Sequence, residues 1–245
     1  MYDDEKWFEE SVITLVRNGW KFKSGYSSRE EYEIKIKNII LNSLGMSSEE
    51  HLRWVADKAE HLRYEFSLNK DSLIIDAGGY DGKWAEEMFR RYNCNIFIFE
   101  PVESFFENIC DKFDGNEKIS SFNVGLSDDY KNQKIYLNKD ATSIHHHNEN
   151  SEDIILVDFN EFIEKKKITK IDLMKINIEG GEYPLLMSII KEMNHTRIKN
   201  ILVQFHTFPE YFDSYREAIE NELKKTHDLV FRYDFIWEHW RIKNK

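Results

Sequence analysis

Short apolar runs alternate with amphipathic segments along most of this chain. The runs lie at residues 72–76, 95–100, 119–124, 171–178 and 200–205. Each has the length of one buried strand, and the segments after most of them carry apolar residues at helical spacing. Continuous apolar strands that alternate with helices indicate an α/β fold with a mostly parallel sheet covered on both faces.

The last third of the chain changes this alternation. A helix is expected over residues 210–226, and residues 229–235 and 237–242 are expected to form a closing antiparallel pair of strands. A helix is also expected at 159–167 and a small extra strand at 134–137. The pattern therefore predicts one sheet with an antiparallel edge.

Residues 1–70 have helical periodicity and no strand pattern. Ser27 and Ser47 each stand three residues before a glutamate, which is the spacing of a capping box at a helix start. We expect an N-terminal helical extension over 1–70 and an α/β domain over 71–245. Packing against the sheet is the simplest role for the extension; a lid, a substrate wall or a homo-oligomer contact are the alternatives.

Composition and charge narrow the function classes. The chain has 245 residues, 41% of them hydrophobic, which suits one large α/β domain with a packed core. The net charge of −11 disfavours nucleic acid as a partner, because proteins that grip phosphates usually carry a basic face. The acidic N-terminus and the lack of an apolar run of about 18 residues predict no membrane span and a cytoplasmic location.

In a sheet of this kind, ligands lie beyond the carboxyl ends of the strands. The first strand is followed by Asp76-Ala77-Gly78-Gly79-Tyr80-Asp81-Gly82. Its glycines allow a close approach of the backbone to a ligand, and the next helix presents free N–H groups. Glu100 ends the second strand, about where an acid binds the ribose hydroxyls of an adenosine-containing cofactor. A nicotinamide dinucleotide and S-adenosylmethionine both fit these features.

Four segments in this order resemble the FkbM family of class I methyltransferases. They are Asp76 to Gly82, Phe99-Glu100-Pro101-Val102, Asn123-Val124-Gly125-Leu126-Ser127-Asp128, and Leu173-Met174-Lys175-Ile176-Asn177-Ile178-Glu179-Gly180-Gly181-Glu182. Val203-Gln204-Phe205-His206 is similar to the family's strand with an acid before a histidine. The resemblance covers roughly residues 70–208.

This resemblance implies a Rossmann-like sheet of seven strands with an antiparallel C-terminal edge, and S-adenosylmethionine as the cofactor. It implies that Asp76, Gly78 and Tyr80 lie along the methionine part of the cofactor. It implies that Glu100 lies at the ribose and Asn123 near the adenine. The other cofactor-binding candidates are Gly79, Pro101, Val102, Val124, Gly125 and Asn177.

Two positions depart from the family pattern. Asn177 stands where the family usually has aspartate, and Gln204 stands where it has an acid before the histidine. Each change keeps a hydrogen-bonding oxygen but removes a charge. Because divalent metals prefer charged oxygen ligands, no metal is expected here.

The catalytic candidates are His206, Glu179, Glu182 and Lys175. His206 is the first candidate for the general base, because imidazole titrates near neutrality; a histidine hydrogen-bonded in a loop is the alternative. Glu179 and Glu182 are candidates for binding acceptor hydroxyls or acting as base, and otherwise form a pair stabilised by a helix N-terminus. Lys175, inside an apolar strand, needs a partner and is expected to pair with Glu179 or Glu182.

The acceptor is suggested by analogy alone. FkbM-like proteins are often O-methyltransferases that act on sugars, polysaccharide precursors or natural products, so a carbohydrate-type hydroxyl is expected. The alternatives are another small molecule, a nucleotide-binding oxidoreductase or a non-catalytic scaffold. The run His145-His146-His147 is interpreted as a solvated loop.

Overall fold

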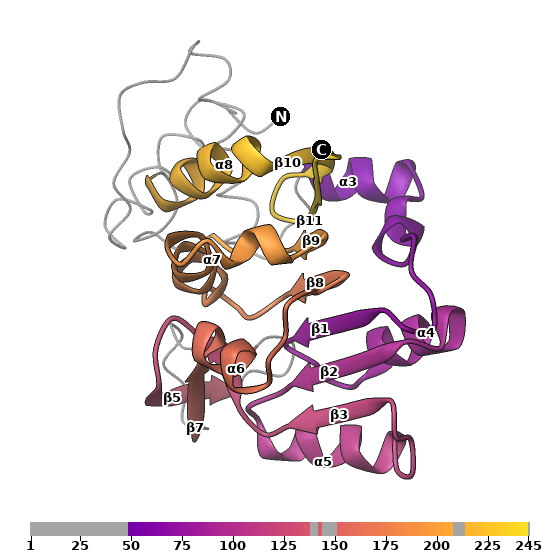
Figure 1. The fold of residues 1–245 in the computed structure, drawn as a ribbon, viewed down its shortest axis with the longest axis vertical. Helices are drawn as coiled ribbons and strands as arrows, with labels where there is room; N and C mark the ends of the chain where they lie inside the picture. Colours follow the sequence, from indigo (N-terminus) through magenta and orange to yellow (C-terminus); the bar gives the residue numbers. More distant parts are fainter. Residues whose placement is uncertain (1–48, 138–141, 144–150, 208–213, 245) are drawn as a thin grey trace, which may run out of the picture.

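The computed structural model describes residues 49–137, 142–143, 151–207 and 214–244. The helices expected within 1–48 and the histidine run at 145–147 lie outside these residues. A seven-stranded sheet crosses the molecule (Figure 1), and its order is β10-β11-β9-β8-β1-β2-β3. The strands are β1 (Leu73–Ala77), β2 (Asn95–Phe99), β3 (Ile119–Phe122), β8 (Leu173–Ile176), β9 (Asn200–Val203), β10 (His227–Tyr233) and β11 (Trp237–Ile242).

The pairing confirms the expected mostly parallel sheet with an antiparallel edge. The five strands from β3 to β9 pair in parallel, whereas β11 runs antiparallel to both β9 and β10. The chain moves outward from β1 through β2 to β3, and later returns to place β8 on the other side of β1. The strand order therefore reverses between β1 and β8, which is where such sheets bind ligands.

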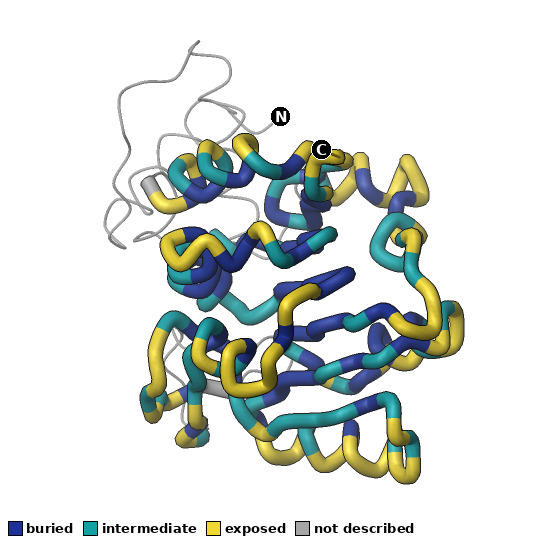
Figure 2. The backbone as a smooth tube through the Cα atoms, in the orientation of Figure 1, coloured by how far each residue is buried: buried dark blue, intermediate teal, exposed yellow. Residues whose placement is uncertain are grey.

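Helices cover both faces of the sheet. One layer holds α3 (Glu49–Ala56), the 3₁₀ helix η1 (Ala59–Arg63), α4 (Lys83–Tyr92) and α5 (Glu103–Lys112). The other holds α6 (Phe159–Lys165), α7 (Glu182–Lys191) and α8 (Ser214–Thr226), and the 3₁₀ helix η2 (Asn194–Arg197) follows α7. Successive strand residues serve opposite layers: Ile74 packs in the core with Trp84, and Ile75 in the core with Leu186. Strands β8 and β9 are buried at every residue (Figure 2).

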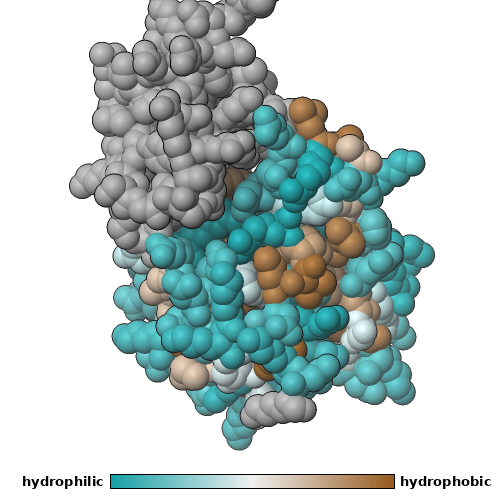
Figure 3. All heavy atoms as spheres, turned by 90° about the horizontal axis from the view of Figure 1, so that it is seen from above, coloured by the Kyte–Doolittle hydropathy of each residue, from teal (hydrophilic) through white to brown (hydrophobic). Residues whose placement is uncertain are grey.

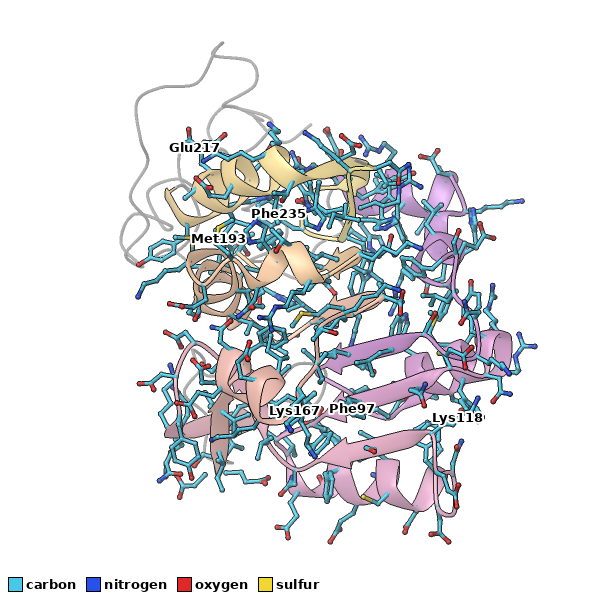
Figure 4. The ribbon with its side chains drawn as sticks, in the orientation of Figure 1. Phe97, Lys118, Lys167, Met193, Glu217 and Phe235 are labelled. Carbon is cyan, nitrogen blue, oxygen red and sulfur yellow. The ribbon has the colours of Figure 1, made fainter. Side chains whose placement is uncertain are left out.

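Aromatic rings pack around the end of β2, just before Glu100. Phe97 lies on β2 (Figure 4), with its ring 5.6 Å from that of Phe122 and 6.2 Å from that of Phe162. Phe99 is fully buried and stacks on Phe122 at 4.9 Å. Burial of one such ring contributes about 1.5–3 kcal/mol, so this end of the strand is held firmly.

A second, four-stranded sheet lies between β3 and α6 in the chain, and the sequence pattern predicts only one of its strands. Its strands are β4 (Gly125–Ser127), β5 (Lys131–Leu137), β6 (Thr142–Ser143) and β7 (Ser151–Asp158), in the order β4-β7-β5-β6. The strand expected at 134–137 is part of β5. Ile135 and Ile154 form a small core with Val102. Because only a few residues of this sheet are buried, its strands lack a strong apolar signature.

The helix α3 packs against the edge strand β10. The Trp54 ring meets the Tyr233 ring edge-on at 5.0 Å. Seen from this end of the sheet, the surface has apolar groups within hydrophilic surroundings (Figure 3). Exposed apolar side chains of α3 and β10 are Leu52, Val55, Leu229 and Val230. Among the described residues, no helix has the length and apolarity needed to cross a membrane.

Candidate functional site

The turn between β1 and α4 is tied directly to the end of β2. The backbone N–H groups of Gly78 and Gly79 both donate to the Phe99 carbonyl, at 3.0 and 3.1 Å. Gly78 has a φ of 84°, Tyr80 a φ of 50° and Gly82 a φ of 70°, so the chain passes three times through the left-handed region before α4 starts. This path brings the turn beside Glu100.

Packing within the protein explains Gly78 and Gly79 of this turn. A Cβ atom on Gly78 would lie 2.0 Å from the Asn177 carbonyl oxygen, and one on Gly79 would lie 2.3 Å from Ile98 Cγ2. The close approach is therefore to the neighbouring strands β8 and β2. The sequence interpretation assigned it to a ligand, because sequence alone does not show which atoms face a glycine.

Glu100 is buried and accepts two backbone hydrogen bonds. Its Oε2 accepts from Tyr80 N at 2.8 Å, and its Oε1 accepts from Val102 N at 3.0 Å. Burial raises the pKa of the Glu100 carboxyl, and these two N–H donors act against that rise. Each carboxylate oxygen can accept a second hydrogen bond, so Glu100 has room for a pair of hydroxyl donors.

Lys175 does not pair with Glu179 or Glu182, which corrects the sequence-based expectation. Its Nζ lies 2.9 Å from Asp76 Oδ1 and 2.6 Å from the Gly78 carbonyl oxygen. Asp76 and Lys175 are register partners on the neighbouring strands β1 and β8, so their side chains share a face. Lys175 therefore pairs with Asp76, which is 99 residues away in the chain, and not with Glu179, which is four residues away.

Two buried oxygens at these strand ends have no hydrogen-bond donor among the described residues. They are Asp76 Oδ2 and Asn177 Oδ1. Asn177 directly follows β8, and its backbone N–H donates to the Ala77 carbonyl at 3.1 Å. Both acceptors therefore lie at the switch point and can receive hydrogen bonds from a bound molecule.

The cofactor-binding candidates that follow β2 and β3 divide into residues that are packed inside the protein and residues that a ligand can reach. Val102 is buried against the second sheet, and a Cβ atom on Gly125 would lie 2.5 Å from Leu156 Cδ2. Both residues serve packing. Asn123 is exposed, and its Nδ2 donates to the carbonyls of Glu100 and Pro101, each at 3.2 Å.

Val124 and Pro101 are only partly buried. Together with Asn123 they are the members of this set that a ligand can still reach. Asn123 also joins the ends of β2 and β3, so it fixes the shape of this surface.

The turn between β8 and α7 has a similar backbone but carries charges. Glu179 has a φ of 52° and Gly180 a φ of 102°. The Glu182 carboxylate is fully buried, accepting from Gly180 N at 2.8 Å through Oε2 and from His206 N at 2.6 Å through Oε1. Glu182 therefore ties the start of α7 to the segment after β9, and its burial and existing hydrogen bonds make direct binding of an acceptor hydroxyl unfavourable.

His206 lies between two carboxylates. Its Nδ1 is 3.1 Å from Glu182 Oε1, and its Nε2 is 3.3 Å from Glu179 Oε1. Both ring nitrogens thus face acceptors, which suits the doubly protonated imidazolium. Burial alone would lower the pKa of His206, but the attraction of Glu182 and the hydrogen bonds of both glutamates raise it to about 10.

This pKa disfavours the role of general base expected for His206. An imidazole with a pKa near 10 is protonated at neutral pH and cannot take up another proton. Glu179 has a side chain that is 30% exposed, so it is the member of the cluster that solvent and small molecules can reach. His206 Nε2 contacts the Oε1 atom of this carboxylate.

Tyr183 belongs to this cluster and was not a sequence-based candidate. Its ring is fully buried, and its hydroxyl donates to the His206 carbonyl at 2.7 Å. A buried tyrosine hydroxyl normally has a hydrogen-bond partner, and this one fixes the backbone that carries His206. The helical spacing of α7 suggests only that Tyr183 packs in the core.

The two turns are neighbours because their strands are. β8 pairs with both β1 and β9, and Gln204 N donates to the Ile176 carbonyl at 3.0 Å. One turn offers backbone and carboxylate acceptors for a polar cofactor, and the other offers a carboxylate supported by an imidazolium. Within the described residues, no group of three side chains suited to holding a metal ion occurs.

The strand order, the glycine turn after β1 and the acid after β2 define a Rossmann-like α/β protein of the methyltransferase type. A family model described as the methyltransferase FkbM domain matches residues 76–235. The chain therefore belongs to the FkbM methyltransferase family, and its cofactor is S-adenosylmethionine. This result excludes the nucleotide-binding oxidoreductase as an interpretation.

Comparison with curated proteins finds no match. Among solved structures, the chain is similar to an rRNA methylase from Streptococcus thermophilus, with 11% identity over 78% of this chain and 96% of that one and a TM-score of 0.43. It is also similar to a precorrin-6y C5,15-methyltransferase from Geobacter metallireducens, with 13% identity over 76% and 87% and a TM-score of 0.41. TrmK of M. capricolum, in complex with S-adenosylhomocysteine, has 12% identity over 73% and 65% and a TM-score of 0.40. Likenesses this low carry no argument about the acceptor.

Proposed function

We propose that this methyltransferase acts on a hydroxyl group of a sugar, a polysaccharide precursor or a similar small molecule. The observation that carries the proposal is the cluster of Glu179, His206 and Glu182 at the carboxyl ends of β8 and β9. A partly exposed carboxylate held by a partly buried imidazolium suits an acceptor that must lose a proton during the reaction.

The residues of the first turn fit the cofactor. Glu100 has spare acceptor capacity for two ribose hydroxyls, as argued above. The oxygens Asp76 Oδ2 and Asn177 Oδ1 lack donors, and the cofactor's ammonium group is a donor. We assign Gly78, Gly79 and Tyr80 to the turn that shapes this part of the site, and Pro101, Asn123 and Val124 to the adenine side.

S-adenosylmethionine, when bound, supplies a methyl group already activated by the sulfonium. The protein must then hold the acceptor oxygen in line and remove its proton. We assign proton acceptance to Glu179, whose Oε1 faces His206 Nε2. A positioned base of this kind contributes about 10²–10⁴-fold to the rate.

Glu182 and His206 act on Glu179 and need not touch the acceptor. Glu182 holds both the backbone and the ring of His206. The imidazolium in turn fixes the rotamer of Glu179. This arrangement follows the general pattern in which a third group orients the residue that exchanges the proton.

The charge of the cluster supports a neutral acceptor. Two carboxylates and one imidazolium leave a local charge of about −1, and the whole chain has a net charge of −11. Both repel a polyanion such as RNA, whereas sugar hydroxyls readily donate to carboxylates.

We also treat residues 1–70 as an extension to the methyltransferase domain at 71–245. The family match begins only at residue 76, after α3 and η1. The contact of α3 with β10 supports a packing role for the described part of this segment.

The test is methyl transfer from isotopically labelled S-adenosylmethionine to a panel of free sugars, nucleotide-linked sugars and short oligosaccharides. We expect label in an ether-linked methyl group of at least one of these acceptors. A parallel panel contains phenols, amines and RNA. Label that enters only this second panel would contradict the proposal and identify the other acceptor class.

A further inference from the structure

The Asp76–Lys175 ion pair lies in the apolar layer between the sheet and α4. Asp76 is fully buried and Lys175 is 4% exposed. Along the same row of the sheet, their register neighbours are Ile98 on β2 and Leu202 on β9, both fully buried. A pair of charges in such a layer carries a large desolvation cost.

Lys175 makes a second hydrogen bond, to the turn itself. Its Nζ is 2.6 Å from the carbonyl oxygen of Gly78, the residue that enters the left-handed region at a φ of 84°. The same ammonium lies 5.8 Å from the centre of the Trp84 ring, at the start of α4. One cation therefore contacts the strand before the turn, the turn and the helix after it.

Folding alone does not require this pair. Replacement of a buried ion pair by apolar residues of similar volume is often neutral or stabilising, whereas removal of one partner is strongly destabilising. The second oxygen of Asp76 has no donor among the described residues, so the pair also leaves an acceptor at the switch point.

We propose that Lys175 is a positioning residue that acts through Gly78 and Asp76 to set the turn after β1 for cofactor binding. It holds the Gly78 carbonyl, which fixes the direction in which the following N–H groups point. It also offsets the charge of the Asp76 carboxylate in an apolar layer. This inference rests on the proposed location of the cofactor at the first turn.

The test separates stability from binding. Lys175→Met alone leaves Asp76 without its cation, so both the thermal midpoint and the affinity for S-adenosylhomocysteine should fall. The double variant Asp76→Asn/Lys175→Met removes the uncompensated charge. We expect its thermal midpoint to return toward that of the wild type, while its affinity stays about tenfold or more below that of Asp76→Asn alone, because only the double variant lacks the hydrogen bond to Gly78.

Lys170→Met is the matched control. Lys170 also pairs with an aspartate, Asp172, at 2.5 Å, but at the opposite end of β8 from the turn. Its affinity for S-adenosylhomocysteine should equal that of the wild type. If the Asp76→Asn/Lys175→Met variant does not fold, the variant Asp76→Leu/Lys175→Met provides the same test, because its side chains at both positions are apolar like the neighbouring Ile98 and Leu202.

In either double variant, a recovered midpoint together with an affinity equal to that of the corresponding single Asp76 variant would overturn the inference, because Lys175 would then serve folding alone. Failure of the wild type and of Lys170→Met to bind S-adenosylhomocysteine would be a different result. It would overturn the cofactor site itself, and this inference with it.

Discussion

The turns after β1 and after β8 are built on the same backbone plan and hold different chemistry. Each passes through the left-handed region at glycine and at one larger residue: at Gly78, Tyr80 and Gly82 in the first turn, and at Glu179 and Gly180 in the second. Each leads into a ten-residue helix, α4 or α7. The backbone plan therefore does not decide what either turn does.

The difference lies in what holds each turn. The first is fixed by backbone hydrogen bonds to Phe99, by the lysine ammonium on the Gly78 carbonyl and by contacts that leave no room for a Cβ atom. The second is fixed by side-chain charges, with Glu182 buried at its centre. Rigid backbone suits the binding of an invariant cofactor, whereas a charged cluster suits the handling of a proton.

Glu179→Gln should have the largest effect, because it removes the proposed base from the second turn. We expect turnover to fall by about 10²–10⁴-fold, while the affinity for S-adenosylhomocysteine changes little. Steady-state kinetics and calorimetry on the same samples measure both. Glu192→Gln, an exposed glutamate just after α7, is the control and should stay fully active. If Glu179→Gln lost turnover and affinity for S-adenosylhomocysteine together, the two turns would not have separate roles in catalysis and cofactor binding.

Gly78→Ala should be next, and it acts through the packing of the first turn. The added Cβ would lie 2.0 Å from a backbone oxygen at a positive φ, so we expect a loss of roughly 2–4 kcal/mol in the free energy of unfolding. Gly115→Ala is the control, with a φ of 72° and no atom within 4 Å of the added carbon. It should lose only about 1 kcal/mol, from backbone strain. If a denaturant titration showed equal losses of unfolding free energy in the two variants, the positive φ, and not close packing, would be the reason for glycine at position 78.

Glu100→Ala should weaken cofactor binding by about ten- to a hundredfold, because it removes acceptors for hydroxyl donors and leaves the Tyr80 and Val102 N–H groups unpaired. Titration calorimetry with S-adenosylhomocysteine measures the change. Glu107→Ala, at an exposed position on α5, controls for the loss of one negative charge. Unchanged affinity in Glu100→Ala would place the ribose elsewhere.

The smallest effect concerns pH and belongs to the second turn. The pKa of His206 rises from 6.5 to about 10 on folding, so its contribution to stability is complete below pH 6.5 and is lost as the pH rises through 10. The difference in unfolding free energy between the wild type and His206→Gln should therefore narrow across that range. His61→Gln, at an exposed position, is the control for the substitution itself. If the difference in unfolding free energy between the wild type and His206→Gln widened as the pH rises, the imidazole of His206 would be neutral in the folded protein.

The sequence predicts the main sheet well and the second sheet poorly. The strands β1, β2, β8 and β9 are short, buried and apolar, so their pattern is distinctive. β4 has only three residues, and it lies within the segment that resembles the family motif. β7 packs only part of one face, and most of its residues are not buried, so its pattern predicts no strand.

The site was predictable as a set of residues but not as a set of interactions. The position of Glu100 after β2 follows from the spacing alone. The partner of Lys175 depends on which strands pair and in which register, and that information is not local in the chain. The charge of His206 depends on two carboxylates that converge on its ring, which no residue spacing reveals.

Hydrogen exchange of the wild-type protein, with and without S-adenosylhomocysteine, tests the division between the turns most directly. We expect the ligand to slow exchange in the peptides covering residues 76–82 and 100–102, and to leave residues 178–183 almost unchanged. Protection confined to residues 178–206, with the turn after β1 unaffected, would contradict it.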